Sequence, residues 1–313
     1  MSADSNFPPR LFLIGAQKCA TTFLADCLAD HPQIELAAPK EPDFFTRNYA
    51  RGLEWYRARF ANSGAAVLLD ASVSYTVAPR APERDNPLSG VPERIRAHAP
   101  EARFVYIVRD PVQRVHSAYW HAVAAGHEDR PFRQAIAEDP WYLNASRYHH
   151  QVQRYLDVFP ADRLLILDMH ETIADPAAAV ARVCRHVGLA PHSALELPED
   201  KRNASYRLST VGRMLVKGGL GREGLGRVAR LARGVLPSSV YGRLRGVVAR
   251  DLPDMVLADR DHVAALLRED TRRFAGLTRL RFDPASTSSP SPAPAPAPAP
   301  ASAPGGTAGQ AGS

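Results

Sequence analysis

The sequence predicts an α/β fold in which a central parallel β-sheet is flanked by helices. Short apolar runs alternate with segments whose apolar residues recur every three or four positions, which are the patterns of buried strands and amphipathic helices. Strands and helices that alternate at this length are typical of a parallel sheet covered on both faces. The chain has 313 residues, of which 45% are apolar, so it is long enough to bury a full core.

Each predicted element has a local signal. The run at 10–15 predicts a buried strand because it is almost wholly apolar, and apolar residues at helical spacing follow it from Ala20 to Leu28. Asp110 can cap a helix that begins at Pro111, since proline is favoured at the first helical position. The other predicted strands are 66–72, 103–110 and 163–169. The other predicted helices are 111–125, 147–159, 175–189 and 259–277.

Composition predicts the domain boundaries. Residues 286–313 carry no charge and no large apolar side chain, so we expect a disordered Pro/Ala-rich tail after one domain at 10–285 and a flexible N-terminus at 1–9. The N-terminal residues do not resemble a signal peptide, and no apolar run approaches the ~20 residues that span a bilayer. The three cysteines fit neither a disulfide framework nor a metal-binding spacing. We therefore expect a cytoplasmic protein that binds no metal.

The net charge of +6 is unevenly distributed along the chain. Residues 211–250 contain nine Lys or Arg and a single acid, Glu223. This segment is either a solvated helical surface or a face for an anionic ligand or membrane lipid. The solvated surface is the more common of the two, and peripheral membrane contact stays open. We expect no nucleic-acid partner, and the sequence does not predict the oligomeric state.

The turn after the first strand has the properties of an anion-binding site. A helix N-terminus presents unpaired backbone N–H groups and a partial positive charge, Lys18 adds a full charge, and Thr21 and Thr22 add hydroxyl groups. Small side chains that would let a phosphate approach the backbone stand at Gly15, Ala16, Cys19 and Ala20. The pattern is not a Walker A motif, because there the lysine follows a glycine and precedes Ser or Thr. On this stretch alone, a surface lysine in an ordinary turn is an equally good interpretation.

A second cationic turn follows the strand at 103–110. Arg109 ends that strand, and Ser117 follows it after seven residues, on the next helix. An arginine can bind a phosphate through two parallel hydrogen bonds, and a serine can add a third to the same group. Ligands of such sheets bind beyond the carboxyl ends of the strands. If the two strands are neighbours, one ligand with phosphates at both ends could bind both turns; the alternative for Arg109 is an ion pair with Asp110.

These two turns resemble those of the sulfotransferases that use 3′-phosphoadenosine 5′-phosphosulfate (PAPS), and the heparan sulfate branch and its bacterial relatives are the most similar. The resemblance implies a P-loop-like three-layer fold and a PAPS-dependent transfer of sulfuryl to an acceptor. It is carried by the segments IGAQKCATTFL and VPERIRAHAPEARFVYIVRDPVQRVHSAYWHAV. It continues in KEPDFF (40–45), LLDASVSY (68–75), FPADRLLILDMHETIADP (159–176) and RNASYRLST (202–210).

The resemblance also implies residue roles. In that family the lysine-containing turn binds the 5′-phosphosulfate, and an arginine and serine separated by seven residues bind the 3′-phosphate. The cofactor-binding residues that follow are Lys18, Cys19, Ala20, Thr21, Thr22, Arg109, Ser117, Ser205 and Arg207. The implied catalytic residues are Lys18, which stabilises charge on the leaving oxygen, and Glu41, which matches the glutamate of the family's E-x-x-F-F segment and acts as the base.

Alternatives remain for several of these roles. Without the resemblance, Glu41 is simply an exposed loop acid, and Ser205 and Arg207 fit a plain surface loop nearly as well as a segment that closes over a nucleotide. Histidines are rival bases, although a histidine on an amphipathic helix is more often structural or solvated. They are His116, His121, His149 and His150.

The sequence departs from the family pattern at a few positions. The family often has glycines where Cys19 and Ala20 stand, and the heparan sulfate enzymes have a lysine at the position of Ala71 and a histidine at that of Asp43. The acceptor, a hydroxyl-bearing carbohydrate, lipid or natural product, is therefore not specified. The alternative function is a P-loop nucleotide-binding small-molecule kinase or a non-catalytic nucleotide binder. It is disfavoured because neither a Walker lysine nor a metal-binding acid is present in the pattern that a kinase needs.

Overall fold

The computed structural model describes residues 6–61, 64–81, 85–191, 206–208, 249–251, 253–278, 280 and 282. Its centre is a five-stranded sheet in the order β2-β3-β1-β4-β5, in which every neighbouring pair is parallel. The strands are β1 (Leu11–Gly15), β2 (Ile34–Leu36), β3 (Val67–Asp70), β4 (Arg103–Val108) and β5 (Leu164–Asp168). A separate antiparallel pair joins β6 (Tyr206–Leu208) to β7 (Ala249–Asp251), and β6 lies close to helix α4.

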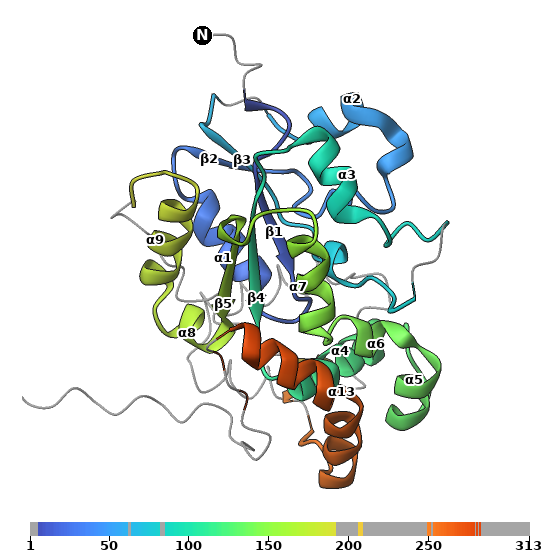
Figure 1. The fold of residues 1–313 in the computed structure, drawn as a ribbon. Coiled ribbons are helices and arrows are strands. Elements are labelled where there is room, and N and C mark those ends of the chain that lie inside the picture. The colour runs from blue at the N-terminus through green and yellow to red at the C-terminus, as the bar shows by residue number, and fades with distance from the viewer. Residues whose placement is uncertain are drawn as a thin grey trace, which may run out of the picture.

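Helices cover both faces of the sheet. On one face lie α1 and α9, and on the other lie α3 and α7, while α13 packs against α4 and α7 (Figure 1). The helices are α1 (Thr21–Ala29), α2 (Gly52–Arg57), α3 (Val91–His98), α4 (Pro111–Ala125), α5 (Phe132–Glu138), α6 (Pro140–Asn144), α7 (Tyr148–Leu156), α8 (Met169–Ala174), α9 (Pro176–His186) and α13 (Leu257–Leu277). Short 3₁₀ helices are η2 (Tyr49–Arg51), η3 (Val73–Thr76) and η4 (Ala161–Arg163). The predicted three-layer α/β fold is thereby confirmed.

The predicted elements are present, with shifted ends. The strand predicted at 66–72 ends at Asp70, because the chain turns there and enters η3. The predicted cap is also present, since the Asp110 carboxylate accepts a hydrogen bond from the Gln113 backbone N–H at 2.7 Å. The sequence missed β2, a three-residue edge strand. The predictions for the tail and for nearly all of the basic segment 211–250 lie outside the described residues.

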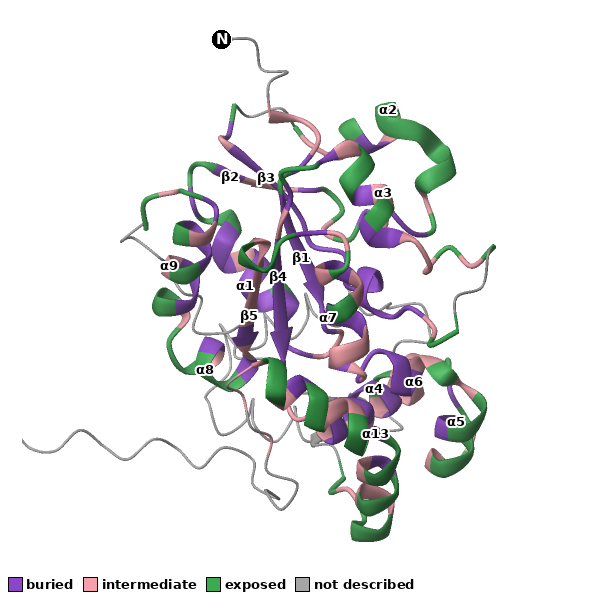
Figure 2. Ribbon diagram, viewed as in Figure 1, coloured by how far each residue is buried: buried purple, intermediate pink, exposed green. Residues whose placement is uncertain are grey.

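The core lies between the sheet and its helices. The inner strands β1, β3 and β4 are almost wholly buried, the edge strands β2 and β5 are partly buried, and the outer faces of the helices are exposed (Figure 2). Phe12, Phe104 and Tyr155 form a chain of ring contacts through this core, with centroids 5.7 and 4.9 Å apart. In the part of the chain that is described, no helix is both long enough and apolar enough to cross a membrane.

The two cationic turns lie side by side. β1 and β4 are hydrogen-bonded neighbours, and the Ala16 N–H, just beyond the end of β1, donates to the Ile107 carbonyl at 2.7 Å. Because both strands run in the same direction, the turns that follow Gly15 and Val108 emerge at the same edge of the sheet, next to α4 and α13 (Figure 1). The adjacency that the sequence left conditional is therefore present.

Candidate active site

The first turn leaves the N-terminus of α1 open. Lys18 and Ala20 have φ angles of 69° and 59°, in the left-handed region that side chains other than glycine rarely adopt. These angles bend the chain sharply, and α1 starts at Thr21 with no side chain of the described residues capping it. The N-terminus of α4, by contrast, is capped by Asp110. Of the two helix starts, only that of α1 keeps its first backbone N–H groups available to an anion.

Gly15 also has a packing role within the protein. Its φ is +136°, and a Cβ at this position would overlap the hydroxyl oxygen of Thr76. That hydroxyl donates to the Ile14 carbonyl at 2.6 Å and ties η3 to the end of β1. Glycine is required here by the close approach of η3, which is a packing constraint within the protein.

The charged residues of the first turn contact two neighbouring elements. Lys18 Nζ lies 3.4 Å from Nδ1 of His121 on α4. Thr21 is buried, whereas Thr22 is exposed and its Oγ1 accepts a hydrogen bond from Lys40 Nζ at 3.2 Å. The turn therefore stands between α4 and the segment that carries Glu41.

Cys19 is buried under this turn. Its sulfur lies 3.9 Å from the Tyr148 hydroxyl, and burial raises the pKa of its thiol. The side chain of Cys19 therefore packs inward as a neutral group, and only the backbone of this residue is available to a ligand. All three cysteines are buried, and none of them forms a disulfide.

Arg109 and Ser117 present unpaired donors at the second turn. Arg109 Nη2 donates to Gln113 Oε1 at 3.0 Å, while Asp110 caps α4. Arg109 Nε and Ser117 Oγ are both buried, and neither has a hydrogen-bond partner among the described residues. Buried polar atoms are normally paired, because an unpaired one costs about 1–3 kcal/mol. An unpaired N–H just before α4 and an unpaired hydroxyl on that helix are groups that a bound phosphate could satisfy.

Glu41 lies beside the first turn. Its carboxylate accepts a hydrogen bond from Lys40 at 2.8 Å, and the same Lys40 ammonium donates to Thr22. The Glu41 side chain is 40% exposed and that of Lys40 is 18% exposed. Lys40, which the sequence offered only as a basic neighbour, is therefore the link that joins the E-x-x-F-F segment to α1.

A buried acid behind Glu41 was missed by the sequence reasoning. Asp70 ends β3, is fully buried, and accepts hydrogen bonds from Tyr56, Tyr75 and Ser72 at 2.6, 2.7 and 2.6 Å. Burial raises the pKa of Asp70 from 3.8 to about 6, although the three hydroxyl groups oppose that shift. The signals in the sequence were an acid at the end of an apolar run and its place in the LLDASVSY segment that carries the family resemblance.

The four histidines that are alternative candidates for the base differ in their contacts. His121 contacts Lys18, as described above. His116 accepts a hydrogen bond from the Trp120 indole at 2.8 Å, and burial lowers the pKa of its imidazole. His149 and His150 lie in the first turn of α7, where their backbone N–H groups donate to Asp270. Only His121 lies in contact with a residue of the first turn.

Ser205 lies outside the described residues. Arg207 belongs to β6, where its backbone pairs with Arg250, and β6 lies close to α4, the helix that carries Ser117. The described part of the segment that the sequence assigned to nucleotide closure, Tyr206–Leu208, thus lies close to α4. The roles of Ser205 and Arg207 stay predictions.

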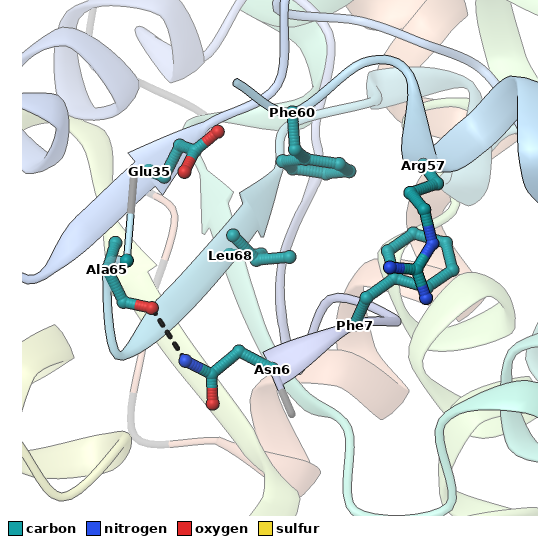
Figure 3. Close-up of a pocket in the computed structure, with 8 residues that line it drawn as sticks. Asn6, Phe7, Glu35, Arg57, Phe60, Ala65 and Leu68 are labelled. Atoms are coloured by element: carbon teal, nitrogen blue, oxygen red, sulfur yellow. Dashed lines mark hydrogen bonds between the residues drawn. The ribbon is translucent and has the colours of Figure 1, made fainter. Parts of the chain in front are cut away.

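A surface cavity lies at the opposite end of the sheet. It is lined by Phe7, Phe60 and Leu68, with Asn6 and Glu35 at its rim, and Asn6 donates to the Ala65 carbonyl at 2.8 Å (Figure 3). These residues lie at the N-terminal ends of the strands or before them, whereas ligands of such sheets bind at the carboxyl ends. Within the described ranges, no three His, Cys, Asp or Glu side chains are grouped so that they could hold a metal ion.

Comparison with known proteins decides the family. Residues 8–205 match the family described as the sulfotransferase domain. This chain belongs to the sulfotransferase family. Human bifunctional heparan sulfate N-deacetylase/N-sulfotransferase 3 is 31% identical over 209 residues, which cover 59% of this chain and 23% of that protein. Human heparan sulfate glucosamine 3-O-sulfotransferase 6 is 28% identical over 190 residues, which cover 58% and 52% of the two chains.

Solved structures support the sulfotransferase fold. The crystal structure of a sulfotransferase from Alicyclobacillus acidocaldarius superposes with a TM-score of 0.60 at 21% identity, and the match covers 88% of this chain and 97% of that one. The chain spans about a quarter of the bifunctional human relative and about half of the 3-O-sulfotransferase. Family membership implies PAPS as the sulfuryl donor and a hydroxyl or amine group as the acceptor.

Proposed function

We propose that this chain transfers the sulfuryl group of PAPS to a hydroxyl group of an acceptor. The observation that carries the proposal is the pair of unpaired buried donors, Arg109 Nε and Ser117 Oγ, next to the open N-terminus of α1. Two anion sites on neighbouring strand ends suit a nucleotide that has phosphate groups at its 3′ and 5′ positions. The residues present therefore fit PAPS.

In this proposal each of the two turns binds one phosphate-bearing end of PAPS. The backbone N–H groups at the start of α1, with Lys18 and Thr22, would hold the 5′-phosphosulfate. Arg109 and Ser117 would hold the 3′-phosphate through charge-assisted hydrogen bonds. When bound, PAPS supplies the sulfuryl group and a phosphate leaving group, and the protein supplies position and charge.

Two residues of the site would act on the reaction itself. Lys18 would neutralise the charge that develops on the leaving oxygen, which is the kind of stabilisation that contributes most to transfer reactions of this type. Glu41 would accept the proton of the acceptor hydroxyl, since the Lys40 bridge holds it beside the start of α1. His121 is the second candidate base, because it contacts Lys18.

A carbohydrate is the first acceptor class to test. The names of the similar human proteins include both an N-sulfotransferase and a 3-O-sulfotransferase of heparan sulfate, so that polysaccharide is a reasonable first probe. Ala71 and Asp43 replace a lysine and a histidine of the heparan sulfate enzymes, and for this reason lipid and natural-product hydroxyls stay in the set. A cytoplasmic location and membrane contact through 211–250 also stay predictions.

The test combines ligand binding with transfer. A thermal shift should show stabilisation by 3′-phosphoadenosine 5′-phosphate (PAP) without Mg²⁺ and none by ATP with Mg²⁺. Incubation with PAPS and a panel of heparan sulfate, a phenol and a long-chain alcohol should then add one sulfuryl mass to one of them, read by mass spectrometry. Stabilisation by ATP and Mg²⁺ alone would favour the kinase alternative, and no stabilisation by PAP would refute the proposal.

A further inference from the structure

The Asp70 carboxylate is connected to the segment that carries Glu41 through hydroxyl groups. Tyr75 donates its O–H to Asp70, and its oxygen accepts the backbone N–H of Phe45 at 3.2 Å. Ser72 also donates to Asp70, and its oxygen accepts the backbone N–H of Asp43 at 3.0 Å. Two relays of the same kind therefore run from one buried acid to two amides of the 41–46 segment.

A carboxylate gives these relays a fixed direction. An ionised carboxylate only accepts hydrogen bonds, so each hydroxyl must point its hydrogen at Asp70 and its lone pairs at the backbone amide. A neutral amide in the place of Asp70 can donate as well as accept, and it would no longer impose one orientation on both hydroxyls. The acid thus selects the arrangement in which the N–H groups of Asp43 and Phe45 are both bound.

Other contacts hold this segment through both its backbone and its side chains. Ser74 donates to the Asp43 carboxylate at 2.6 Å, Asn48 donates to the Pro42 carbonyl at 2.8 Å, and Phe44 stacks on the Tyr56 ring with centroids 4.2 Å apart. The Glu41 side chain itself projects out of this network and contacts Lys40. Its position therefore depends both on its bond to Lys40 and on the contacts that hold the residues that follow it.

We infer that Asp70 is a positioning residue, which fixes the 41–46 backbone through Tyr75 and Ser72 and thereby holds Glu41 beside the Lys18 turn. The inference rests on the proposed role of Glu41 as the base. A buried acid is expensive to keep ionised, and burial alone raises the pKa of Asp70. If apolar packing alone fixed the shape of this site, a buried charge at position 70 would not be needed.

The sequence offers a matched pair of variants for the test. Tyr56 and Tyr75 are both fully buried, and both donate to the same oxygen of Asp70, at 2.6 and 2.7 Å. Only the Tyr75 oxygen also accepts an N–H of the 41–46 segment. Tyr75→Phe and Tyr56→Phe thus each remove one hydrogen bond to the same Asp70 oxygen, from rings that are equally buried. Only Tyr75→Phe also removes the acceptor of the Phe45 N–H.

Two measurements separate positioning from stability. Hydrogen–deuterium exchange should accelerate at the Phe45 amide in Tyr75→Phe and stay unchanged there in Tyr56→Phe. Single-turnover sulfation at saturating PAPS, with the acceptor of the panel that supports turnover, should fall about ten- to a hundredfold in Tyr75→Phe, since small displacements of a catalytic group have effects of this size. Tyr56→Phe should stay within about threefold of the parent, and PAP affinity should not change in either variant.

The outcomes distinguish this inference from the proposed function. Equal rates in the two variants, or equal exchange at Phe45, would overturn the role of Asp70 even if the parent protein transfers sulfuryl normally. A parent protein that binds no PAP and sulfates no acceptor would instead overturn the proposed function, and the inference with it. A fall in PAP affinity in Tyr75→Phe alone would assign the relay to the donor site and would also refute the inference.

Discussion

Replacing Ser117 with alanine should weaken the binding of PAP without destabilising the free protein. The Ser117 hydroxyl is buried, with the residue 4% exposed, and it has no hydrogen-bond partner among the described residues. A buried polar group in this condition costs about 1–3 kcal/mol. Because Ser117→Ala removes that group, the free energy of unfolding of the free protein should stay the same or rise.

In the bound state the same hydroxyl would donate to the 3′-phosphate. A hydrogen bond to a charged group contributes about 1.5–3 kcal/mol, and a tenfold change in affinity corresponds to about 1.4 kcal/mol. The dissociation constant of PAP should therefore rise about ten- to 150-fold in Ser117→Ala. Adenosine 5′-phosphosulfate, which lacks the 3′-phosphate, should lose almost nothing.

Isothermal titration calorimetry with both nucleotides measures the change in affinity, and thermal unfolding measures stability. Ser146→Ala is the matched control. Ser146 is 1% exposed and fully bonded, since its hydroxyl accepts from Arg114 Nε and donates to the Pro111 carbonyl at 2.9 Å. Its loss leaves a buried Arg114 N–H unpaired, so Ser146→Ala should lower the melting temperature by several degrees.

Two results would refute the reasoning about Ser117. Equal losses of affinity for the two nucleotides would mean that the hydroxyl does not bind the 3′-phosphate. A loss of stability in Ser117→Ala as large as that in Ser146→Ala would mean that the hydroxyl is bonded within the protein and serves the fold.

Three further predictions concern the residues around the transfer. Lys18→Ala should lower the rate about 10²–10³-fold and PAP affinity much less, and turnover within a few-fold of the parent would contradict this. Glu41→Gln should lower single-turnover sulfation ~10²–10⁴-fold, and a fall below tenfold would make His121 the next candidate. The raised pKa of Asp70 stabilises the protein below about pH 4, and that stability is lost as the pH rises through about 6. In Asp70→Asn, the free energy of unfolding measured by denaturation should not show this fall of about 3 kcal/mol between pH 4 and 7.5. Parallel pH dependences for the parent and the variant would contradict the prediction.

The sequence predicted the parts of the fold whose signals are local. β1 and β4 are continuous apolar runs followed by a helix start, so their positions and the two cationic turns could be read directly. β2 could not be predicted, because the three residues Ile34, Glu35 and Leu36 are too few to establish a period. Its place at the edge of the sheet is decided by pairing with β3, a partner more than thirty residues away.

The site was predicted in outline, and its contacts were not. Lys18 contacts His121, which is 103 positions away in the sequence, and Lys40 donates to Thr22, which is 18 positions away. Such contacts depend on how the strands are ordered, and no sequence spacing encodes that order. Asp70 was missed for a related reason: an acid after an apolar run is ordinary, and its role depends on hydroxyl groups that only the fold gathers around it.

The proposed donor side of the site and the surroundings of Asp70 differ in whether their hydrogen bonds are complete without a ligand. On the proposed donor side, Arg109 Nε and Ser117 Oγ are buried without hydrogen-bond partners among the described residues, and a bound anion would complete their hydrogen bonding. On the acceptor side, Asp70 accepts three hydrogen bonds and needs no ligand. Substitutions on the proposed donor side should therefore act mainly on affinity, because they would remove bonds that form only in the complex. Substitutions around Asp70 should act on the rate, because they would loosen a geometry that is already formed before any ligand binds.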